Sequence, residues 1–440
     1  MVMDIQSVLA RCVGGSVLAL AAVLAGCGGG GGDEALAASA STTTGAATAA
    51  DAAPEALDAR ASALAVRKNP TTPVYRVTDL GTFGGTSSAA YAINEIGQVV
   101  GTAALAGNGP SHAFLYNGSG LQDLGVLPFS AGDWGPPSSA AHGINNRGQV
   151  TGNSEVGDFG TYHAFLYSWG SLQELAIGGS FVDGSDINDS GQIAGTRAEH
   201  DQAFVWEDGA FQLLGTLPGG RDSQAHAINY RGQITGVSSK APSAGQAALP
   251  DHAFLYSNGV MRDLGTLGGT MSNGFDINTK GWVTGMSALP GDAVTHAFLH
   301  DGKKMRDLGT LGGEISGGSA VNDMGQVVGS SYTTGFENPH AFIWNEGVMY
   351  DLNGLLDDSG DAWTLIGAAD INGRGQIVGT GMINGQLHGY LLTPVAKEQH
   401  KGRWSGREWR LAVTAALNNL RTHCGSAAGT ALFPNKCKAL

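Results

Sequence analysis

The chain has 440 residues, 42% of them hydrophobic and 70 of them glycine, which is enough to bury a large core interrupted by many turns. It carries 38 acidic against 24 basic residues and a net charge of -14. This balance argues against nucleic acid as a partner, because nucleic-acid binding favours clustered basic surface.

The first 26 residues have the pattern of a bacterial lipoprotein signal peptide. Arg11 precedes an apolar run from 13 to 26, and Cys27 follows it directly. The run is too short for a membrane span and is typical of a segment that is removed. The pattern predicts acylation of Cys27 and a place on the outer membrane or cell surface. A plain secretory signal is the alternative.

Residues 27–65 are rich in Gly, Ala, Ser and Thr. Such a segment cannot bury a core, so we expect a flexible tether. The body of the protein then extends over residues 66–396, where one unit of about 45 residues is repeated seven times. Each copy carries Ile-Asn or Val-Asn, then two residues and Gly, and later a segment such as His-Ala-Phe-Leu.

Each copy contains four short apolar segments separated by turn residues, which predicts four antiparallel strands and therefore a propeller blade. The chain enters the unit late, at Asp79-Leu80-Gly81, and leaves it early, at His388-Gly389-Tyr390-Leu391. The offset predicts that the N-terminal strand completes the last blade. We therefore expect an all-β fold, a seven-bladed β-propeller closed by the N-terminal strand, with a short C-terminal helix as an extension.

Turn residues separate two rims of the predicted propeller. The first and second strands of every copy are joined by Asn-x-x-Gly, in which Asn bonds its own backbone and Gly takes a positive φ. The loops on the opposite rim vary in length. Those between second and third strands are expected at 152–162, 237–251, 286–295 and 330–339, and one between blades at 126–138. Variable loops on a repeated scaffold are where binding usually resides. Mixed aromatic and acidic loops there give the candidate ligand-binding residues: Phe129, Asp133, Trp134, Phe159, Tyr162, Tyr332 and Phe336.

The triplet His-Ala-Phe recurs at His112, His163, His252, His296 and His340, and Asp-Leu-Gly-Thr-Leu-Gly-Gly follows it in several copies. On these motifs the chain resembles the HAF-repeat family of probable extracellular bacterial proteins over residues 74–394. The resemblance implies export and repetition. It implies no defined activity.

Six of the seven third strands begin with His, which raises the question of a metal site. Ring symmetry spreads these residues around the disc, too far apart for one ion whose ligands lie about 2 Å away. We therefore predict structural histidines bonded to the backbone or a loop of a neighbouring blade, and no metal or cofactor.

Acidic residues before the Ile-Asn pair, namely Asp186, Asp276 and Asp370, are expected to project toward the channel and to hold a cation or water. A shared site is not expected, because they belong to alternate copies. The run Asp357-Asp358-Ser359-Gly360-Asp361 has the composition of a calcium loop but lacks the EF-hand spacing, so it is interpreted as a solvated turn.

Residues 397–440 form a basic tail. A helix is predicted over 407–422, with an apolar stripe that docks on the propeller or contacts a membrane or partner. Cys424 and Cys437 are close in sequence in an exported chain, which predicts a local disulfide.

No nucleophile elbow, phosphate-binding loop or zinc-protease motif is present, so no catalytic residue is assigned. The sequence favours a lipid-anchored binding or scaffolding module that meets the membrane through its lipid and a glycan or protein partner through its loops. One alternative is a propeller hydrolase or lyase acting on glycans or peptides with acidic loop residues. Another is a spacer without a ligand.

Overall fold

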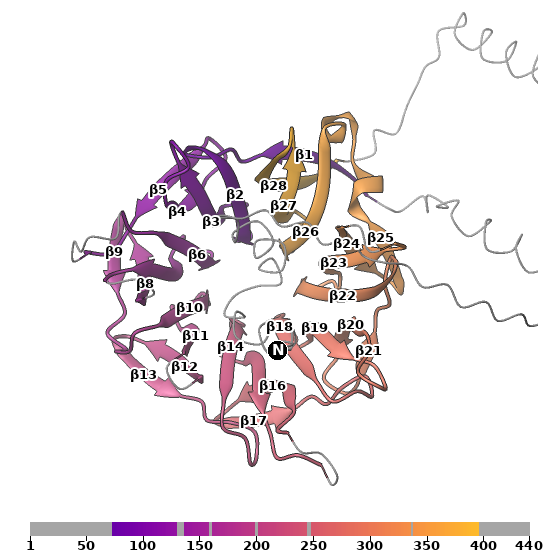
Figure 1. Cartoon of the computed structure of the whole chain (residues 1–440). Coiled ribbons are helices and arrows are strands. Elements are labelled where there is room, and N and C mark those ends of the chain that lie inside the picture. The colour runs from indigo at the N-terminus through magenta and orange to yellow at the C-terminus, as the bar shows by residue number, and fades with distance from the viewer. Residues whose placement is uncertain are drawn as a thin grey trace, which may run out of the picture. The chain divides into compact units, whose positions relative to one another are not determined.

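The computed structural model describes residues 73–129, 136–157, 161–198, 201–243, 248–335 and 338–395. The predicted signal peptide, the tether with Cys27, and the tail with its helix, Cys424 and Cys437 lie outside these ranges. In the described part, 28 strands follow one another in chain order. Figure 1 shows them gathered in groups that follow one another around a ring, with β2, β6, β10, β14, β18, β22 and β26 innermost; the axis of this ring is called the channel below. No helix in these ranges combines the length and the hydrophobicity that crossing a bilayer requires.

The strands form seven antiparallel units of four, as the sequence predicted. Blade 1 is β2 (Gly84–Ile93), β3 (Val99–Leu105), β4 (Ser111–Tyr116) and β5 (Leu121–Gly125); blade 2 is β6 (Ser139–Ile144), β7 (Val150–Glu155), β8 (Tyr162–Ser168) and β9 (Ser171–Glu174). Blade 3 is β10 (Val182–Ile187), β11 (Ile193–Arg197), β12 (Gln202–Glu207) and β13 (Ala210–Leu213); blade 4 is β14 (Ser223–Ile228), β15 (Ile234–Ser239), β16 (Asp251–Ser257) and β17 (Val260–Asp263). Blade 5 is β18 (Ser272–Ile277), β19 (Val283–Ala288), β20 (Thr295–His300) and β21 (Met305–Asp307); blade 6 is β22 (Gly312–Val321), β23 (Val327–Thr333), β24 (Pro339–Asn345) and β25 (Val348–Asp351). Blade 7 is β26 (Trp363–Ile371), β27 (Ile377–Ile383), β28 (Gln386–Val395) and β1 (Val74–Asp79).

The two ends of the described chain meet in blade 7, which confirms the predicted closure. β1 pairs antiparallel with β28 from Val74 opposite Val395 to Asp79 opposite Tyr390. A short 3-10 turn, η3 (Asp358–Gly360), also holds the closing strand, because the Val77 N–H donates to Ser359 Oγ at 2.9 Å. The first strand therefore supplies the fourth strand of the last blade (Figure 1).

The Asn-x-x-Gly hairpins are built as predicted, and they carry one further bond. Asn145 Oδ1 accepts from Arg147 N–H and Gln149 N–H, which fixes its own turn. Its Nδ2 donates to the carbonyl of Asn188 in the next blade at 2.9 Å. The same inter-blade bond recurs from Asn94, Asn188, Asn229, Asn278, Asn322 and Asn372. These seven buried residues, the asparagine belt, encircle the channel without a gap.

Small residues on the innermost strands are required by the neighbouring blade. A Cβ on Gly184 would lie 2.2 Å from Thr151 Oγ1 of the preceding blade, and a Cβ on Gly274 would lie 2.4 Å from Thr235 Oγ1. Real Cβ atoms do not approach that closely, so an alanine at either position would require the threonine to shift. The small residues at this register therefore reflect a contact between adjacent blades.

Second strands extend further toward the variable rim than the sequence predicted. Loops were expected from Gly152, Val237, Met286 and Ser330, but β7, β15, β19 and β23 continue to Glu155, Ser239, Ala288 and Thr333. Cross-strand pairing continues there, for example between Ser154 and His163. The connecting loops are correspondingly shorter.

Candidate functional site

Three of the predicted ligand-binding residues are described. Phe129 follows β5 and is partly exposed, Tyr162 opens β8, and Tyr332 lies in β23 opposite Pro339. The Tyr162 ring packs edge-on against Phe181, with the ring centroids 5.6 Å apart. Asp133, Trp134, Phe159 and Phe336 lie outside the described residues, so the structure does not bring this set together.

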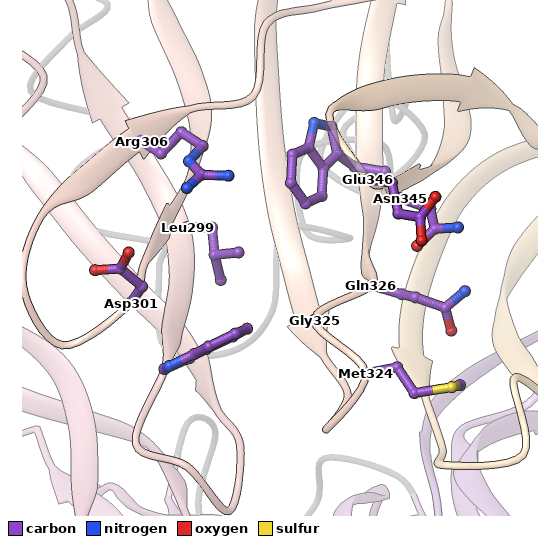
Figure 2. A pocket seen from close by; sticks show the side chains of 10 residues that line it. Leu299, Asp301, Arg306, Met324, Gly325, Gln326, Asn345 and Glu346 are labelled. Carbon is purple, nitrogen blue, oxygen red and sulfur yellow. The ribbon is translucent and has the colours of Figure 1, made fainter.

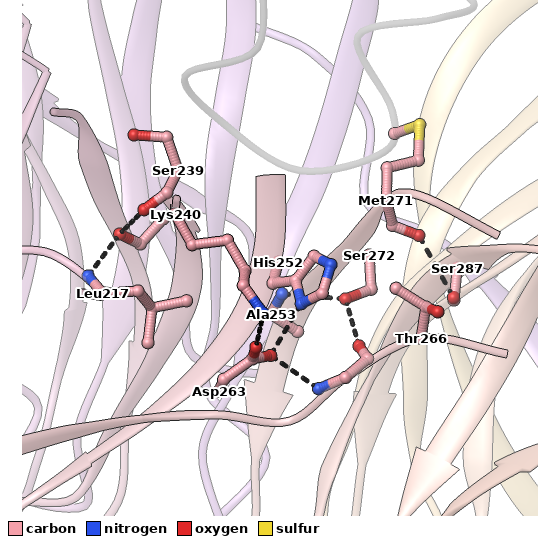
Figure 3. A network of polar contacts seen from close by, with 12 residues as sticks. Leu217, Ser239, Lys240, His252, Ala253, Asp263, Thr266, Met271, Ser272 and Ser287 are labelled. Carbon is pink, nitrogen blue, oxygen red and sulfur yellow. Dashed lines mark hydrogen bonds and ion pairs between the residues drawn. The ribbon is translucent and has the colours of Figure 1, made fainter. Parts of the chain in front are cut away.

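The repeated histidines contact a different partner from the one predicted. His252 Nδ1 lies 2.7 Å from Asp263 Oδ1 (Figure 3). Asp263 belongs to the fourth strand of the same blade, so the partner of this histidine is not in a neighbouring blade. Lys240 and the Gly265 N–H bond the same carboxylate. Although burial opposes it, these hydrogen bonds hold the pKa of Asp263 well below its usual range.

The same histidine–carboxylate pair occurs in five further blades, and it joins the third strand to the fourth. The pairs are His112 with Asp123, His163 with Glu174, His296 with Asp307, His340 with Asp351, and His388 with Asp79. Because His388 and Asp79 come from opposite ends of the described chain, this last pair also closes the ring. Each imidazole is thus engaged in its own blade, and no group of three metal-ligating side chains is found in the described part.

The acidic run at Asp357 forms a capped turn. The Asp357 carboxylate accepts from the Ser359 N–H at 3.0 Å, and Arg76 lies 3.5 Å away. Backbone also ties this turn to β1, since Asp357 N–H donates to the Tyr75 carbonyl. The segment anchors the closing strand.

Three carboxylates on the innermost strands bridge adjacent blades. Asp186 Oδ1 accepts from its neighbour Ile187 N–H, and its Oδ2 accepts from Ile228 N–H of the next blade at 2.9 Å. Asp276 does the same with Ile277 and Val321, and Asp370 with Ile371 and Ile93. These carboxylates are therefore hydrogen-bonded to the backbone of two adjacent blades.

The channel carboxylates titrate near neutral pH. Burial raises the pKa of Asp186 and of Asp370 to about 6. Burial, reinforced by the charges of Asp370 and Asp186, raises the pKa of Asp276 to about 8. Backbone N–H bonds oppose each shift without reversing it. The channel thus contains acids that are partly protonated at pH 7.

The position two residues before each belt asparagine's Ile or Val differs from blade to blade. It holds Tyr91, His142, Ser185, His226, Phe275, Ser319 and Ala369. The rings of Tyr91 and His142 meet edge-on with centroids 5.8 Å apart, and those of His226 and Phe275 are 5.7 Å apart. We call this set the channel layer. Its aromatic and imidazole members lie on blades 1, 2, 4 and 5, and the small side chains lie elsewhere.

His142 and Asp183 form an ion pair inside the channel layer. Nδ1 lies 2.8 Å from Asp183 Oδ1, and Asn153 and Ser185 also bond the carboxylate. Burial lowers the pKa of His142, but the Asp183 charge outweighs it and the net pKa is raised. Burial alone would raise the pKa of Asp183. The charge of His142 and the hydrogen bonds from His142, Asn153 and Ser185 outweigh burial, so the net pKa of Asp183 is lowered. The charge of Asp183 and its hydrogen bond thus favour the protonated form of His142.

His226 has the opposite protonation state. Its Nδ1 lies 2.8 Å from the Gly274 carbonyl, which can only accept, so Nδ1 carries the proton. Burial lowers the pKa of His226. The ring is therefore neutral, with Nε2 as a hydrogen-bond acceptor. Two histidines whose pKa values shift in opposite directions make the channel layer a candidate functional site. They belong to no repeated motif, so the motifs of the sequence do not identify them.

Comparison with known proteins identifies no family for this chain. No family model matches the chain, and no curated protein does. Similar solved structures include the β-propeller domain of the Trilobed protease from Pyrococcus furiosus, with 10% identity, 73% of this chain and 95% of that chain covered, and a TM-score of 0.47. TolB from Acinetobacter baumannii has 13% identity, 67% and 80% coverage, and a TM-score of 0.36. Virginiamycin B lyase from Staphylococcus aureus has 10% identity, 73% and 100% coverage, and a TM-score of 0.42.

Proposed function

We propose that this protein is an exported, lipid-tethered β-propeller that binds a glycan or a protein partner at the channel layer and the variable rim around it. One observation carries the proposal: the channel layer has five kinds of residue at its seven positions, whereas the belt beside it is asparagine in all seven blades. Divergence at one register of a repeated scaffold is typical of a binding surface.

The chemistry of the channel layer fits a ligand with both apolar and polar parts. Tyr91 and Phe275 offer aromatic rings, which contribute large contact areas in binding sites. The His142–Asp183 ion pair and the neutral His226 offer fixed hydrogen-bond donors and acceptors. Phe129, Tyr162 and Tyr332 belong to the proposed site as residues of the variable rim, Phe129 after β5 and the two tyrosines at strand ends.

Ligand screening with channel-layer variants tests this proposal. The full chain, solubilised in detergent, is screened on a glycan array and by pull-down from cell-envelope extract. We expect a bound partner whose affinity falls at least tenfold in the double variant Tyr91→Ala, Phe275→Ala. Ser319→Ala in the same layer is the control and should bind normally. Absence of any partner would favour the spacer alternative, and binding that the double variant retains would place the site elsewhere.

Export and tethering rest on the first 27 residues and on the resemblance to HAF-repeat proteins. Incorporation of a labelled fatty acid tests them, with Cys27→Ser as the control. We expect label in the wild-type protein and in the membrane fraction, and neither in the variant. An unlabelled, secreted wild-type protein would favour the plain secretory signal.

An enzyme acting on a glycan or peptide is the second candidate, and His226 is the observation that favours it. His226, with its proton on Nδ1 and its pKa lowered by burial, is a candidate general base, and the His142–Asp183 pair in the same layer is a candidate proton donor. Turnover of the ligand found in the screen, abolished by His226→Ala, would decide for the enzyme. Stable binding without product would decide for the binding module.

A further inference from the structure

A groove lies at the seam between blades 5 and 6, on the rim formed by the regular hairpins. It has a volume of about 370 Å³ and is lined by Trp282, Leu299, Asp301, Arg306, Met324, Gly325, Gln326, Trp344, Asn345 and Glu346. Figure 2 shows Leu299, Asp301 and Arg306 on one side and Gln326, Asn345 and Glu346 on the other. The groove is separate from the channel layer. It lies on the rim opposite the variable loops.

Trp282 makes this seam different from the others. In six blades the residue after the hairpin Gly is Gln, and there the belt Asn donates to the Gln side chain, as Asn229 does to Gln233 at 2.9 Å. Blade 5 has Trp282 instead and lacks that bond. Its indole packs against Gly325 of blade 6, and Lys280 Nζ lies 4.8 Å from the ring centroid. The asparagine belt does not require this replacement. The partly exposed indole of Trp282 cannot make the hydrogen bond that Gln makes in the other six blades.

The polar groups of the groove include several that the protein leaves uncommitted. Among the described residues, neither Arg306 nor Glu346 has a side-chain hydrogen bond or ion pair, and Gln326 uses Oε1 for Asn322 while Nε2 is unused. Asp301 is held in place by the N–H groups of Lys303 and Lys304, and these bonds lower its pKa. The groove thus offers a guanidinium, an amide N–H and two carboxylates to a ligand.

This combination selects for a saccharide. The half-exposed indole of Trp282 presents a flat apolar face against which the C–H face of a sugar packs, whereas Trp344 is almost fully buried and forms part of the groove wall. Planar polar side chains bond the hydroxyls of a sugar, which both donate and accept. Arg306 and the neighbouring Lys280 are balanced by Asp301 and Glu346, so the groove has no excess of positive charge to select a phosphorylated or strongly anionic ligand. The volume is near the lower end of small-molecule sites, roughly 300–1,000 Å³, which fits about one or two sugar rings. We propose that the groove between Trp282 and Trp344 is a saccharide-binding site.

The seam between blades 4 and 5 provides a matched control. Arg262 pairs with Leu255 as Arg306 pairs with Leu299, so the two arginines occupy the same place in their blades. At the two indole positions, however, that seam has Gln233 and His300. It therefore presents a similar arginine without the tryptophans.

The test uses the full chain in detergent on an array of chitin, cellulose, starch-type and cell-wall oligosaccharides, followed by titration of the strongest hit by tryptophan fluorescence. We expect one class of oligosaccharide to bind and its affinity to fall at least tenfold in both Trp282→Gln and Arg306→Ala. Arg262→Ala should bind as the wild type does. Trp282→Gln introduces the residue that six blades already use, so its unfolding midpoint should match that of the wild type.

Two results would overturn the inference: no oligosaccharide bound by the wild type, or binding that survives both Trp282→Gln and Arg306→Ala. The inference does not depend on the channel-layer proposal. Tyr91→Ala separates them, because it should leave this saccharide bound normally. A glycan lost from Tyr91→Ala but retained by Trp282→Gln would support the channel layer and contradict the groove.

Discussion

Two layers of the innermost strands lie side by side and follow opposite rules. The asparagine belt has the same residue in all seven blades, and each member is buried and bonded to the next blade. The channel layer, three residues earlier, has five different kinds of side chain at its seven positions and is mostly half-exposed. The contrast teaches that repetition in this protein marks what closes the ring, and divergence marks what the ring offers to a ligand.

Deleting residues 66–85 should give the largest effect on the repeated part. The deletion removes β1, and with it the six residue pairs between β1 and β28 and the Asp79 partner of His388. Because the ring would then open and expose two strand edges, we expect loss of the cooperative fold of all seven blades. Circular dichroism and limited proteolysis measure it. If only blade 7 became protease-sensitive, the blades would be an open array.

A single belt residue should have the next largest effect. Asn229→Ala removes the acceptor for Arg231 N–H and Gln233 N–H and the donor to Asn278 O. Leaving buried polar groups unpaired costs about 1–3 kcal/mol each, so we expect a loss of roughly 3–5 kcal/mol in the free energy of unfolding by urea. Tyr230→Ala, a neighbouring residue with a half-exposed ring, is the control and should lose less than about 0.5 kcal/mol. Equal losses would refute a special role for the belt.

The channel carboxylates should give a smaller, pH-dependent effect. The folded-state pKa of Asp276 is about 8, above the value of 3.8 for an ordinary Asp, so between these values only the folded state holds the proton. Its contribution to stability is complete below pH 3.8 and is lost as pH rises through 8, at up to about 1.4 kcal/mol per pH unit. Asp276→Ala should therefore lose less stability, relative to the wild type, at pH 8 than at pH 5.

Urea unfolding at several pH values checks this, and blades 4 and 6 justify the substitution, since they carry Ala227 and Ala320 at the same place. A difference that is independent of pH would mean that the carboxylate is already ionised in the folded protein, held so by the Ile277 and Val321 N–H groups.

The sequence predicted the fold well because each blade is encoded locally. Asn-x-x-Gly specifies a hairpin through bonds within five residues, and seven such copies with an offset specify a closed ring. The belt bond from Asn94 to the Asn145 carbonyl was not predictable in this way, since it depends on how closely adjacent blades approach. The histidine partners were predictable in principle. From His112 to Asp123, and in four other pairs, the separation is always 11 residues.

The candidate sites were harder to predict than the fold. The channel layer is visible in the sequence only as one register where the copies disagree, such as Tyr91, His142 and His226. In the sequence, Trp282 is visible as a departure from the Gln of the other six copies. Its proximity to Trp344, however, depends on how blade 5 packs on blade 6. Sites assembled across seams have no local signature, because no single copy contains them.

The belt also has a direction. The side-chain amide of every belt asparagine donates to the next blade, and its backbone carbonyl accepts from the previous blade. Asn372 Nδ2 completes the cycle by donating to the Asn94 carbonyl at 3.1 Å. Such a cycle has no first or last member, so the break between residues 395 and 74 leaves no trace in it. A circularly permuted chain, with these ends joined and new termini in another loop of the variable rim, should keep the cycle and fold to the same ring.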